Sequence, residues 1–330
     1  MHPVLATTAQ AMLFSGAMVA LLAHNIVWAD QAGPGADLSA TDRGMVQTAA
    51  GNSGCGARPL GELTVATLSA TPIVTLSANG HPVTLILDTG AERTVFTPAA
   101  ADRIGAQPPR VQFERRLQGT SGRLPSHEVE LHTFDAAGLS IPWHRVVVAQ
   151  VALTKIFSEP LDGVLGADVL GRYDVEIDLA HQHLLFYERD SCPTGPPWPG
   201  RYTAVSAGRS GAGRLFFPIQ LDRHRLMAII DSGAQRTMLP LSVARSIGLT
   251  EATLAQERSV LTREATGELL WGHTHQFSIL EVGAEIIRIP ELIVADFVLP
   301  DAQIVLGVDV LNLRRIWLSY GSLQIFLASP

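Results

Sequence analysis

The sequence predicts an all-β protein of two homologous lobes in a pseudo-two-fold arrangement, with a short helix after each of two repeated loops. Short runs of aliphatic and β-branched residues recur after residue 62, separated by Gly, Pro, Asn and Asp. Such runs are typical of strands, and nothing in them suggests the long helices of a βαβ protein. A duplicated pair of motifs predicts the division into two lobes.

The duplication covers two motifs at matching distances. Residues 88–96 (DTGAERTVF) align with residues 231–239 (DSGAQRTML), and five of the nine positions are identical. Residues 164–170 (VLGADVL) align with residues 305–311 (VLGVDVL), 78 residues separating Asp88 from Gly166 and 76 separating Asp231 from Gly307. Because motif order and spacing repeat together, the chain holds two homologous halves. Two copies are too few for a solenoid. They favour two lobes that are arranged like the subunits of a dimer but belong to one chain.

The N-terminal 62 residues do not belong to this plan. Residues 1–29 are predicted to be an export signal, because residues 11–23 form a 13-residue apolar run that is too short to span a bilayer. The segment before this run contains His2 and no Lys or Arg, so an uncleaved membrane anchor and a buried helix remain alternatives. Residues 30–62 are rich in Gly, Ala, Ser and Asp and are expected to be a flexible leader. The alternative, a propeptide, would need a basic cluster that this segment lacks.

The first lobe is predicted at residues 63–190. Residues 73–76 and 83–87 are expected to pair around an Asn79-Gly80 turn, and Thr97-Pro98 to open a short helix that ends at Gly105. Further strands are predicted at 129–134, 141–151, 173–179 and 184–187, and a short helix at 167–170.

A proline-rich linker, predicted at residues 191–212, separates the lobes, since Pro and Gly at this density exclude helix and central strand. The second lobe, residues 213–330, repeats the plan. It has a predicted hairpin at 215–221 and 225–230, a helix at 240–247, and strands at 269–280, 285–295 and 316–327.

Taken together, the motifs resemble those of the retropepsin-like aspartic proteases. The features that carry the resemblance are a hydrophobic pair before Asp-(Thr/Ser)-Gly-Ala and an aliphatic-aliphatic-Gly signal about 75–80 residues later. The resemblance covers residues 63–328 and joins in one chain the two halves that viral members assemble from two chains. It implies that Asp88 and Asp231 hold a water between their carboxylates, one acting as general base and the other as general acid. Two such acids share one proton because they cannot both ionise at close range.

The same resemblance assigns roles to the neighbouring residues. The hydroxyls at the second motif position would hydrogen-bond across the lobes, the glycines would admit backbone amides, and the alanines would line the cleft. These catalytic-loop residues are Thr89, Gly90, Ala91, Ser232, Gly233 and Ala234. Two glycines, Gly166 and Gly307, would pack beneath the loops. Two glycine-bearing hairpin tips would act as flaps over the substrate, at Gly119, Thr120, Ser121 and Gly122 and at Thr266 and Gly267.

Several positions depart from the viral pattern. Glu92 and Gln235 stand where an aspartate that contacts substrate backbone is usual, so substrate preference does not carry over. Asp168 and Asp309 are expected to cap or brace the short helices. Since Ala91 and Ala234 provide no hydroxyl to the dyad, we expect it to keep its shared proton to higher pH, with best activity at about pH 4–6.

Two further sets of residues were considered. The pairs His181/His183 and His273/His275 have strand spacing suited to zinc, but neither has an obvious third ligand, so no metal site is predicted. Cys55 and Cys192 are the only cysteines in the chain. An even pair at matching positions before each lobe suggests one disulfide in an exported protein.

The sequence therefore predicts a monomeric, periplasmic or secreted aspartic endopeptidase that acts on polypeptides without a cofactor. A net charge of −7 argues against nucleic acid as a partner, and a membrane is expected only if the N-terminal segment stays uncleaved. The alternatives are a non-catalytic peptide-binding module of the same fold in the cell envelope and, more weakly, a structural envelope protein.

Overall fold

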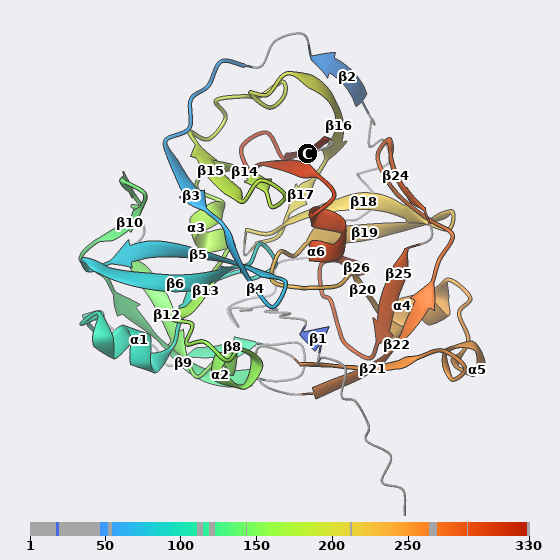
Figure 1. Cartoon of the computed structure of the whole chain (residues 1–330), viewed down its shortest axis with the longest axis horizontal. Coiled ribbons are helices and arrows are strands. Elements are labelled where there is room, and N and C mark those ends of the chain that lie inside the picture. The colour runs from blue at the N-terminus through green and yellow to red at the C-terminus, as the bar shows by residue number, and fades with distance from the viewer. Residues whose placement is uncertain are drawn as a thin grey trace, which may run out of the picture.

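The computed structural model of the chain describes residues 18–19, 47–51, 55–110, 115–118, 123–142, 144–211, 213–263, 269–288 and 290–328. Within these ranges the protein is built from strands in three sheets, with six short helices (Figure 1). The helices are α1 (Pro98–Arg103), α2 (Leu153–Ile156), α3 (Ala167–Leu170), α4 (Leu241–Ser246), α5 (Glu251–Leu254) and α6 (Val308–Leu311). The predicted all-β fold class is confirmed.

The first sheet belongs to the N-terminal half and has the order β11-β10-β5-β6-β13-β7-β12-β9-β8, with β4 paired to β5. Its strands are β4 (Ala66–Leu68), β5 (Thr71–Ala78), β6 (His81–Leu87), β7 (Val95–Phe96), β8 (Arg115–Gln118), β9 (Arg123–Glu130), β10 (Phe134–Ala136), β11 (Leu139–Ser140), β12 (Arg145–Ala149) and β13 (Gly163–Leu165). The predicted β5–β6 hairpin is confirmed. Its turn residues Asn79 and Gly80 both have positive φ, as a two-residue turn of this type requires.

The second sheet repeats this plan in the C-terminal half, with the order β1-β21-β22-β25-β20-β26-β19-β18-β23-β24 and with β17 paired to β18. Its strands are β1 (Met18–Val19), β17 (Gly208–Arg209), β18 (Leu215–Leu221), β19 (His224–Ile230), β20 (Met238–Pro240), β21 (Ser259–Arg263), β22 (Leu269–Gln276), β23 (Ile279–Val282), β24 (Glu285–Arg288), β25 (Glu291–Ala295) and β26 (Ile304–Leu306). In each half, the strand that ends at the motif aspartate lies parallel to the strand that ends at the motif glycine. These pairs are β6 with β13 and β19 with β26.

The third sheet joins the two halves. Its order is β2-β16-β28-β27-β14-β15-β3, with strands β2 (Gln47–Gly51), β3 (Gly61–Thr64), β14 (Asp174–Asp178), β15 (His183–Tyr187), β16 (Gly200–Ser206), β27 (Arg315–Ser319) and β28 (Gln324–Ala328). The strands predicted to close the first lobe, β14 and β15, therefore also hydrogen-bond toward the second half through the β14–β27 pair. Parts of the predicted leader and of the predicted linker lie in this sheet, as β2, β3 and β16.

Other elements differ from the sequence prediction in detail. The single runs expected at 141–151, 269–280, 285–295 and 316–327 are each shortened or divided by a turn. Helices α2 and α5 were not predicted, because four residues are too few to show helical periodicity.

The hydrophobic core explains how the site is held. One large cluster of buried side chains spans both halves, and a smaller cluster lies at each catalytic loop. The two smaller clusters use equivalent positions of the repeat, among them Ile86, Ala91, Val95 and Val164 in one half and Ile229, Ala234, Met238 and Val305 in the other. Each loop therefore rests on its own apolar support.

Cys55 and Cys192 form the predicted disulfide, with Cα atoms 5.5 Å apart. It anchors residue 55 beside a cluster that contains Trp198 and Trp317. Disulfides of this kind persist in oxidising compartments, which fits an exported protein. Among the described residues, none of the helices is both long and apolar enough to cross a bilayer.

Candidate active site

The two motif aspartates end equivalent buried strands and meet at the boundary between the halves. Asp88 follows β6 and Asp231 follows β19, and the side chains of both are fully buried. Their backbone amides donate to Leu165 O at 3.1 Å and to Leu306 O at 3.0 Å. The parallel strands β13 and β26 thus fix where each carboxylate leaves the sheet.

Each carboxylate accepts hydrogen bonds from its own loop. Asp88 Oδ1 accepts from Ala91 N at 2.8 Å. Asp231 Oδ1 accepts from Gly233 N at 2.9 Å and from Ala234 N at 3.1 Å. The Oδ2 atoms of both aspartates are buried and, apart from the contact of the two carboxyls with each other, receive no hydrogen bond from the described residues. One oxygen of each acid is therefore held by the backbone, and the other remains available for chemistry.

The hydroxyl residues of the two loops clamp the halves together as the sequence predicted. Thr89 Oγ1 donates to Ile230 O at 2.8 Å and accepts from Ser232 N at 3.1 Å. Reciprocally, Ser232 Oγ donates to Leu87 O at 2.7 Å and accepts from Thr89 N at 3.1 Å. Four buried hydrogen bonds thus fix one loop against the other.

Glycine is required at the next position by close packing across the boundary. A Cβ atom on Gly90 would lie 2.4 Å from Asp231 Cγ, and one on Gly233 would lie 2.6 Å from Asp88 Cγ. Both distances are far below van der Waals contact, so a side chain at either position would displace the opposite carboxylate. Each acid therefore packs against the loop that carries the other acid.

Burial and mutual proximity change the acidity of the pair. Burial raises the pKa of Asp88 well above its usual range, and the nearby Asp231 carboxylate raises it further. Burial also raises the pKa of Asp231, to about 6, against the lowering effect of hydrogen bonds from Asp88 and from the Gly233 and Ala234 amides. The positive charge of Arg214 also lowers the pKa of Asp231, to a smaller extent. Both carboxyls therefore hold a proton to higher pH than an exposed aspartate, and the pair titrates as one coupled unit.

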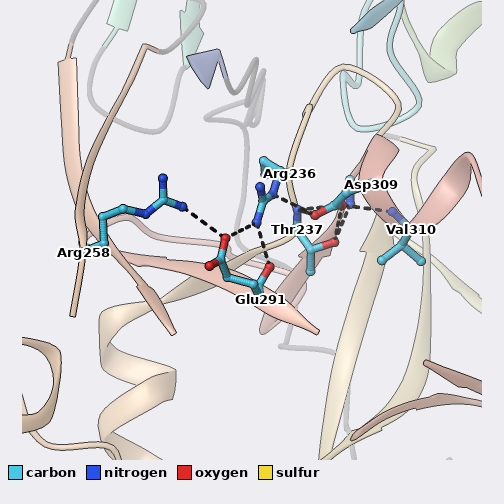
Figure 2. Close-up of polar contacts among 7 residues, drawn as sticks. Arg236, Thr237, Arg258, Glu291, Asp309 and Val310 are labelled. Atoms are coloured by element: carbon cyan, nitrogen blue, oxygen red, sulfur yellow. Dashed lines mark hydrogen bonds and ion pairs between the residues drawn. The ribbon is translucent and has the colours of Figure 1, made fainter. Parts of the chain in front are cut away.

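A second pair of aspartates supports the loops from beneath. Asp168 Oδ1 accepts from Thr94 N at 2.7 Å and from Thr94 Oγ1 at 2.8 Å. Asp309 Oδ1 likewise accepts from Thr237 N at 2.9 Å and Thr237 Oγ1 at 2.8 Å, as Figure 2 shows. These carboxylates were expected to cap or brace the short helices. Asp309 does accept from Val310 N, but the principal contacts of both residues are to the catalytic loops.

Each threonine hydroxyl of this support also accepts a hydrogen bond from the motif glycine, from Gly166 N to Thr94 Oγ1 and from Gly307 N to Thr237 Oγ1, both at 3.1 Å. A Cβ atom on either glycine would lie 2.5 Å from a backbone carbon of the loop. Both motif glycines, Gly166 and Gly307, therefore lie beneath the loops as predicted. The space around them does not admit a side chain.

An arginine in each loop completes the support and was not assigned this role from sequence. Arg93 pairs with Asp168 and Glu128, at 3.2 and 3.1 Å. Arg236 pairs with Asp309 at 3.2 Å and with Glu291 at 2.8 Å, and Arg258 also reaches Glu291 (Figure 2). The sequence did contain a sign of these ion pairs, because an Arg and an Asp recur at nearly equal spacing in both halves.

The residues after the motif alanines make unequal contacts across the halves. Glu92 pairs with Arg214 at 3.2 Å, and Arg214, which is 2% exposed, also pairs with Asp301 at 3.1 Å. In the other direction, neutral Gln235 donates to Ser69 O and to Thr71 Oγ1. One side of the boundary is therefore charged and the other is neutral, so the two halves of the site are not equivalent.

The predicted flap residues lie outside the described residues. The strands that precede and follow them are described, and they pair antiparallel as β8 with β9 and β21 with β22. Of the four histidines considered for zinc, His181 contacts Asp178, His183 contacts Glu62 and His275 contacts Glu257. In the described part of the chain, no three His, Cys, Asp or Glu side chains form a group that could hold a metal ion.

Comparison with known proteins agrees with this geometry. Residues 74–169 match the aspartyl protease family, and residues 217–313 match the family of gag-polyprotein aspartyl proteases. Each matched segment contains one motif aspartate and the motif glycine that follows it. A search of curated protein sequences finds no significant match.

Among solved structures, an aspartic proteinase from Irpex lacteus matches with 13% identity and a TM-score of 0.50, over 82% of this chain and 97% of that one. Basic 7S globulin from soybean matches with 12% identity and a TM-score of 0.44, over 82% of this chain and 94% of that one. At this level of identity the Irpex lacteus likeness concerns the fold.

Proposed function

Since this chain carries two aspartyl protease domains in tandem, and is a peptidase and hydrolase of the retropepsin-like type, we propose that it is an endopeptidase with one catalytic acid from each half. The observation that carries this proposal is the mutual packing of the two buried aspartates. Each carboxylate lies against the glycine of the opposite loop, and the loops are clamped by Thr89 and Ser232. Neither half could form this dyad alone.

In the proposed mechanism, Asp88 carries the shared proton and Asp231 is ionised. The higher pKa of Asp88, whose ionisation the nearby Asp231 carboxylate disfavours, supports this assignment. A water held between the Oδ2 atoms loses a proton to Asp231 and attacks the peptide carbonyl carbon, while Asp88 donates its proton to the carbonyl oxygen. In the tetrahedral intermediate, Asp231 returns a proton to the amide nitrogen. The C–N bond then breaks, and Asp88 recovers a proton from the hydroxyl.

The substrate is proposed to be a polypeptide, bound by a monomeric chain that needs no cofactor. Export to the periplasm or the exterior is proposed as well. The Cys55–Cys192 disulfide supports it, and so does the export signal predicted at residues 1–29.

The proposal is tested by cleavage of a mixed peptide library at several pH values, with and without a statine inhibitor, by the wild type and by Asp88→Asn and Asp231→Asn. Each substitution removes one of two non-redundant proton carriers, so we expect turnover to fall by at least about a thousandfold. Thermal unfolding of each variant shows whether the fold is intact. Binding of statine without any turnover by the wild type would favour the peptide-binding module instead, and substantial activity in either variant would rule out the two-acid mechanism.

A further inference from the structure

A cavity away from the dyad is lined by three arginines. Its volume is about 470 Å³, within the usual range of about 300–1,000 Å³ for small-molecule sites. Arg172 follows α3, Arg189 follows β15 and Arg209 lies in β17, so three separate segments of the chain bring positive charge to one cavity. Arg189, from the first half, also donates to Tyr320 O of the second half at 3.0 Å.

The carboxylates of the described chain do not balance this charge. The one acidic residue of the cavity wall, Asp168, is 9% exposed at its side chain and already pairs with Arg93 and Thr94. Within the described ranges, Arg189 and Arg209 form no ion pair, although Glu188 and Asp190 flank Arg189 in the chain. All three arginines are at exposed positions, so each can meet a ligand that enters from solvent. Two of the three arginines of the cavity wall, Arg189 and Arg209, therefore have no carboxylate partner in the described part of the chain.

The arginines are not a consequence of the duplicated fold. Counted from the motif glycines, the position of Arg172 corresponds to Leu313 in the second half. Arg209 lies in β17, between the strands β16 and β18, in the segment that joins the halves. Structural repetition thus gives no reason for this cluster, and ligand binding does.

We propose that this cavity binds a small oxyanion, a carboxylate or phosphate group on a small molecule. Guanidinium groups match the planar, bidentate geometry of these anions. The glycine backbone at Gly171, Gly211 and Gly213 lines the wall without side chains and lets a compact ligand approach the arginines. The site is distinct from the peptidase dyad, because none of its lining residues belongs to the catalytic loops.

The test is calorimetric titration of inorganic phosphate and, separately, citrate into the whole protein at constant ionic strength set with chloride. We expect saturable binding at one site, and a weakening of at least about tenfold in an Arg189→Gln/Arg209→Gln double variant, because the variant lacks two of the charge-assisted hydrogen-bond donors. Arg225→Gln is the matched control, because Arg225 is also exposed but does not line the cavity. Asp88→Asn should bind the anion as the wild type does.

The two probes distinguish the sources of the ligand, since tighter binding of phosphate indicates a phosphorylated molecule and tighter binding of citrate a polycarboxylate. Either result supports the site when the double variant loses the binding. Absence of saturable binding by both probes, equal weakening in Arg225→Gln, or loss of binding in Asp88→Asn would overturn the proposal. The last outcome would place the anion in the catalytic cleft.

Discussion

At the scale of single residues, the site is governed by what each loop position can hold beside a buried carboxylate. Gly90 and Gly233 admit only hydrogen, because the opposite carboxyl carbon occupies the space of a Cβ atom. Ala91 and Ala234 are almost completely buried and contribute their amides but no hydroxyl. The acidity of the dyad is therefore set by burial, by the effect of each carboxyl on the other, by backbone amides and, for Asp231, by Arg214. No hydroxyl donor contributes at the alanine position, which differs from a loop with Ser or Thr there.

The first residue-scale prediction concerns Ala234→Ser. A hydroxyl there would donate to the Asp231 carboxylate and favour its charged form, so the pKa of Asp231, about 6 in this protein, should fall. The acidic limb of kcat/KM against pH should then move to lower pH, by about one unit. Because the pKa of Asp231 is about 6, the best activity of the wild type should lie above about pH 6, higher than the range expected from sequence.

Ala91→Ser serves as the counterpart, since its hydroxyl would act on Asp88 and should move the basic limb instead. Identical profiles for the wild type and both variants would mean that groups outside the dyad set the titration.

Sequence motifs predicted the roles of residues that belong to the repeated segments. They did not predict roles that depend on contacts between distant, unrepeated parts of the chain. Asp88, Asp231, Thr89 and Ser232 stand in aligned motifs, so their meeting follows from the two-fold plan. The Glu92–Arg214 pair joins residues 122 positions apart whose types are not repeated, and only the packing of β18 against the first loop brings them together.

At the scale of elements, each catalytic loop is supported by one threonine that both donates and accepts. Thr237 Oγ1 donates to Asp309 and accepts from Gly307 N, and it is 1% exposed. Thr94 does the same in the first half. Because the loop, the strand end and the short helix meet at this hydroxyl, the support transmits any displacement directly to the aspartate.

Replacement of this hydroxyl by a methyl group, Thr237→Val, should therefore destabilise the protein and slow turnover together. The change leaves a buried amide and a carboxylate oxygen short of one hydrogen bond each, which costs about 1–3 kcal/mol. Thermal unfolding and kcat measure the two effects. Thr75→Val is the control, because its hydroxyl pairs only with Thr84 at an exposed position. If both valine variants matched the wild type in unfolding temperature and kcat, the loop support would not depend on this hydroxyl.

The sheet that joins the halves shows where element prediction from sequence reached its limit. Strands β14 and β15 were placed near their observed bounds, because their apolar runs are distinct, whereas β27 and β28 were predicted as one run. Their pairing across the halves was not predicted, since strand partners far apart in sequence leave no local pattern. Strand β2 was missed because its five residues contain no large apolar side chain.

At the scale of the whole molecule, one chain supplies both acids and also holds them together. Three kinds of contact join the halves within a single polypeptide. They are the third sheet, the four hydrogen bonds of Thr89 and Ser232, and the Arg315–Glu176 pair between β27 and β14. The dyad therefore needs no second copy.

Specific activity should stay constant on dilution over about three orders of magnitude, measured with a fluorogenic peptide. A fall in specific activity that followed dissociation of a dimer by light scattering would show that the halves pair between chains.

The stability of the whole molecule should decrease as pH rises from acidic toward neutral. All carboxyls with a resolved pKa change are shifted upward by burial, and these are Asp88, Asp168, Asp174, Glu176, Asp231 and Asp309. A raised pKa means that the folded state binds the proton more tightly than the unfolded state. The stabilisation is thus complete below the unfolded pKa, 3.8 for Asp, and is lost as pH rises through the folded pKa, about 6 for Asp231.

The two acids of the dyad should account for much of this loss, because both are fully buried and both have raised pKa values. We therefore expect the unfolding temperature, measured by calorimetry at constant ionic strength, to be higher at pH 4 than at pH 7 by several degrees. Asp231→Asn cannot titrate at this position, so its unfolding temperature should change less over the same interval. An unfolding temperature that rose from pH 4 to pH 7 in the wild type would contradict the prediction. It would mean that carboxylates stabilised in their charged form outweigh the buried acids of the dyad and of the joining sheet.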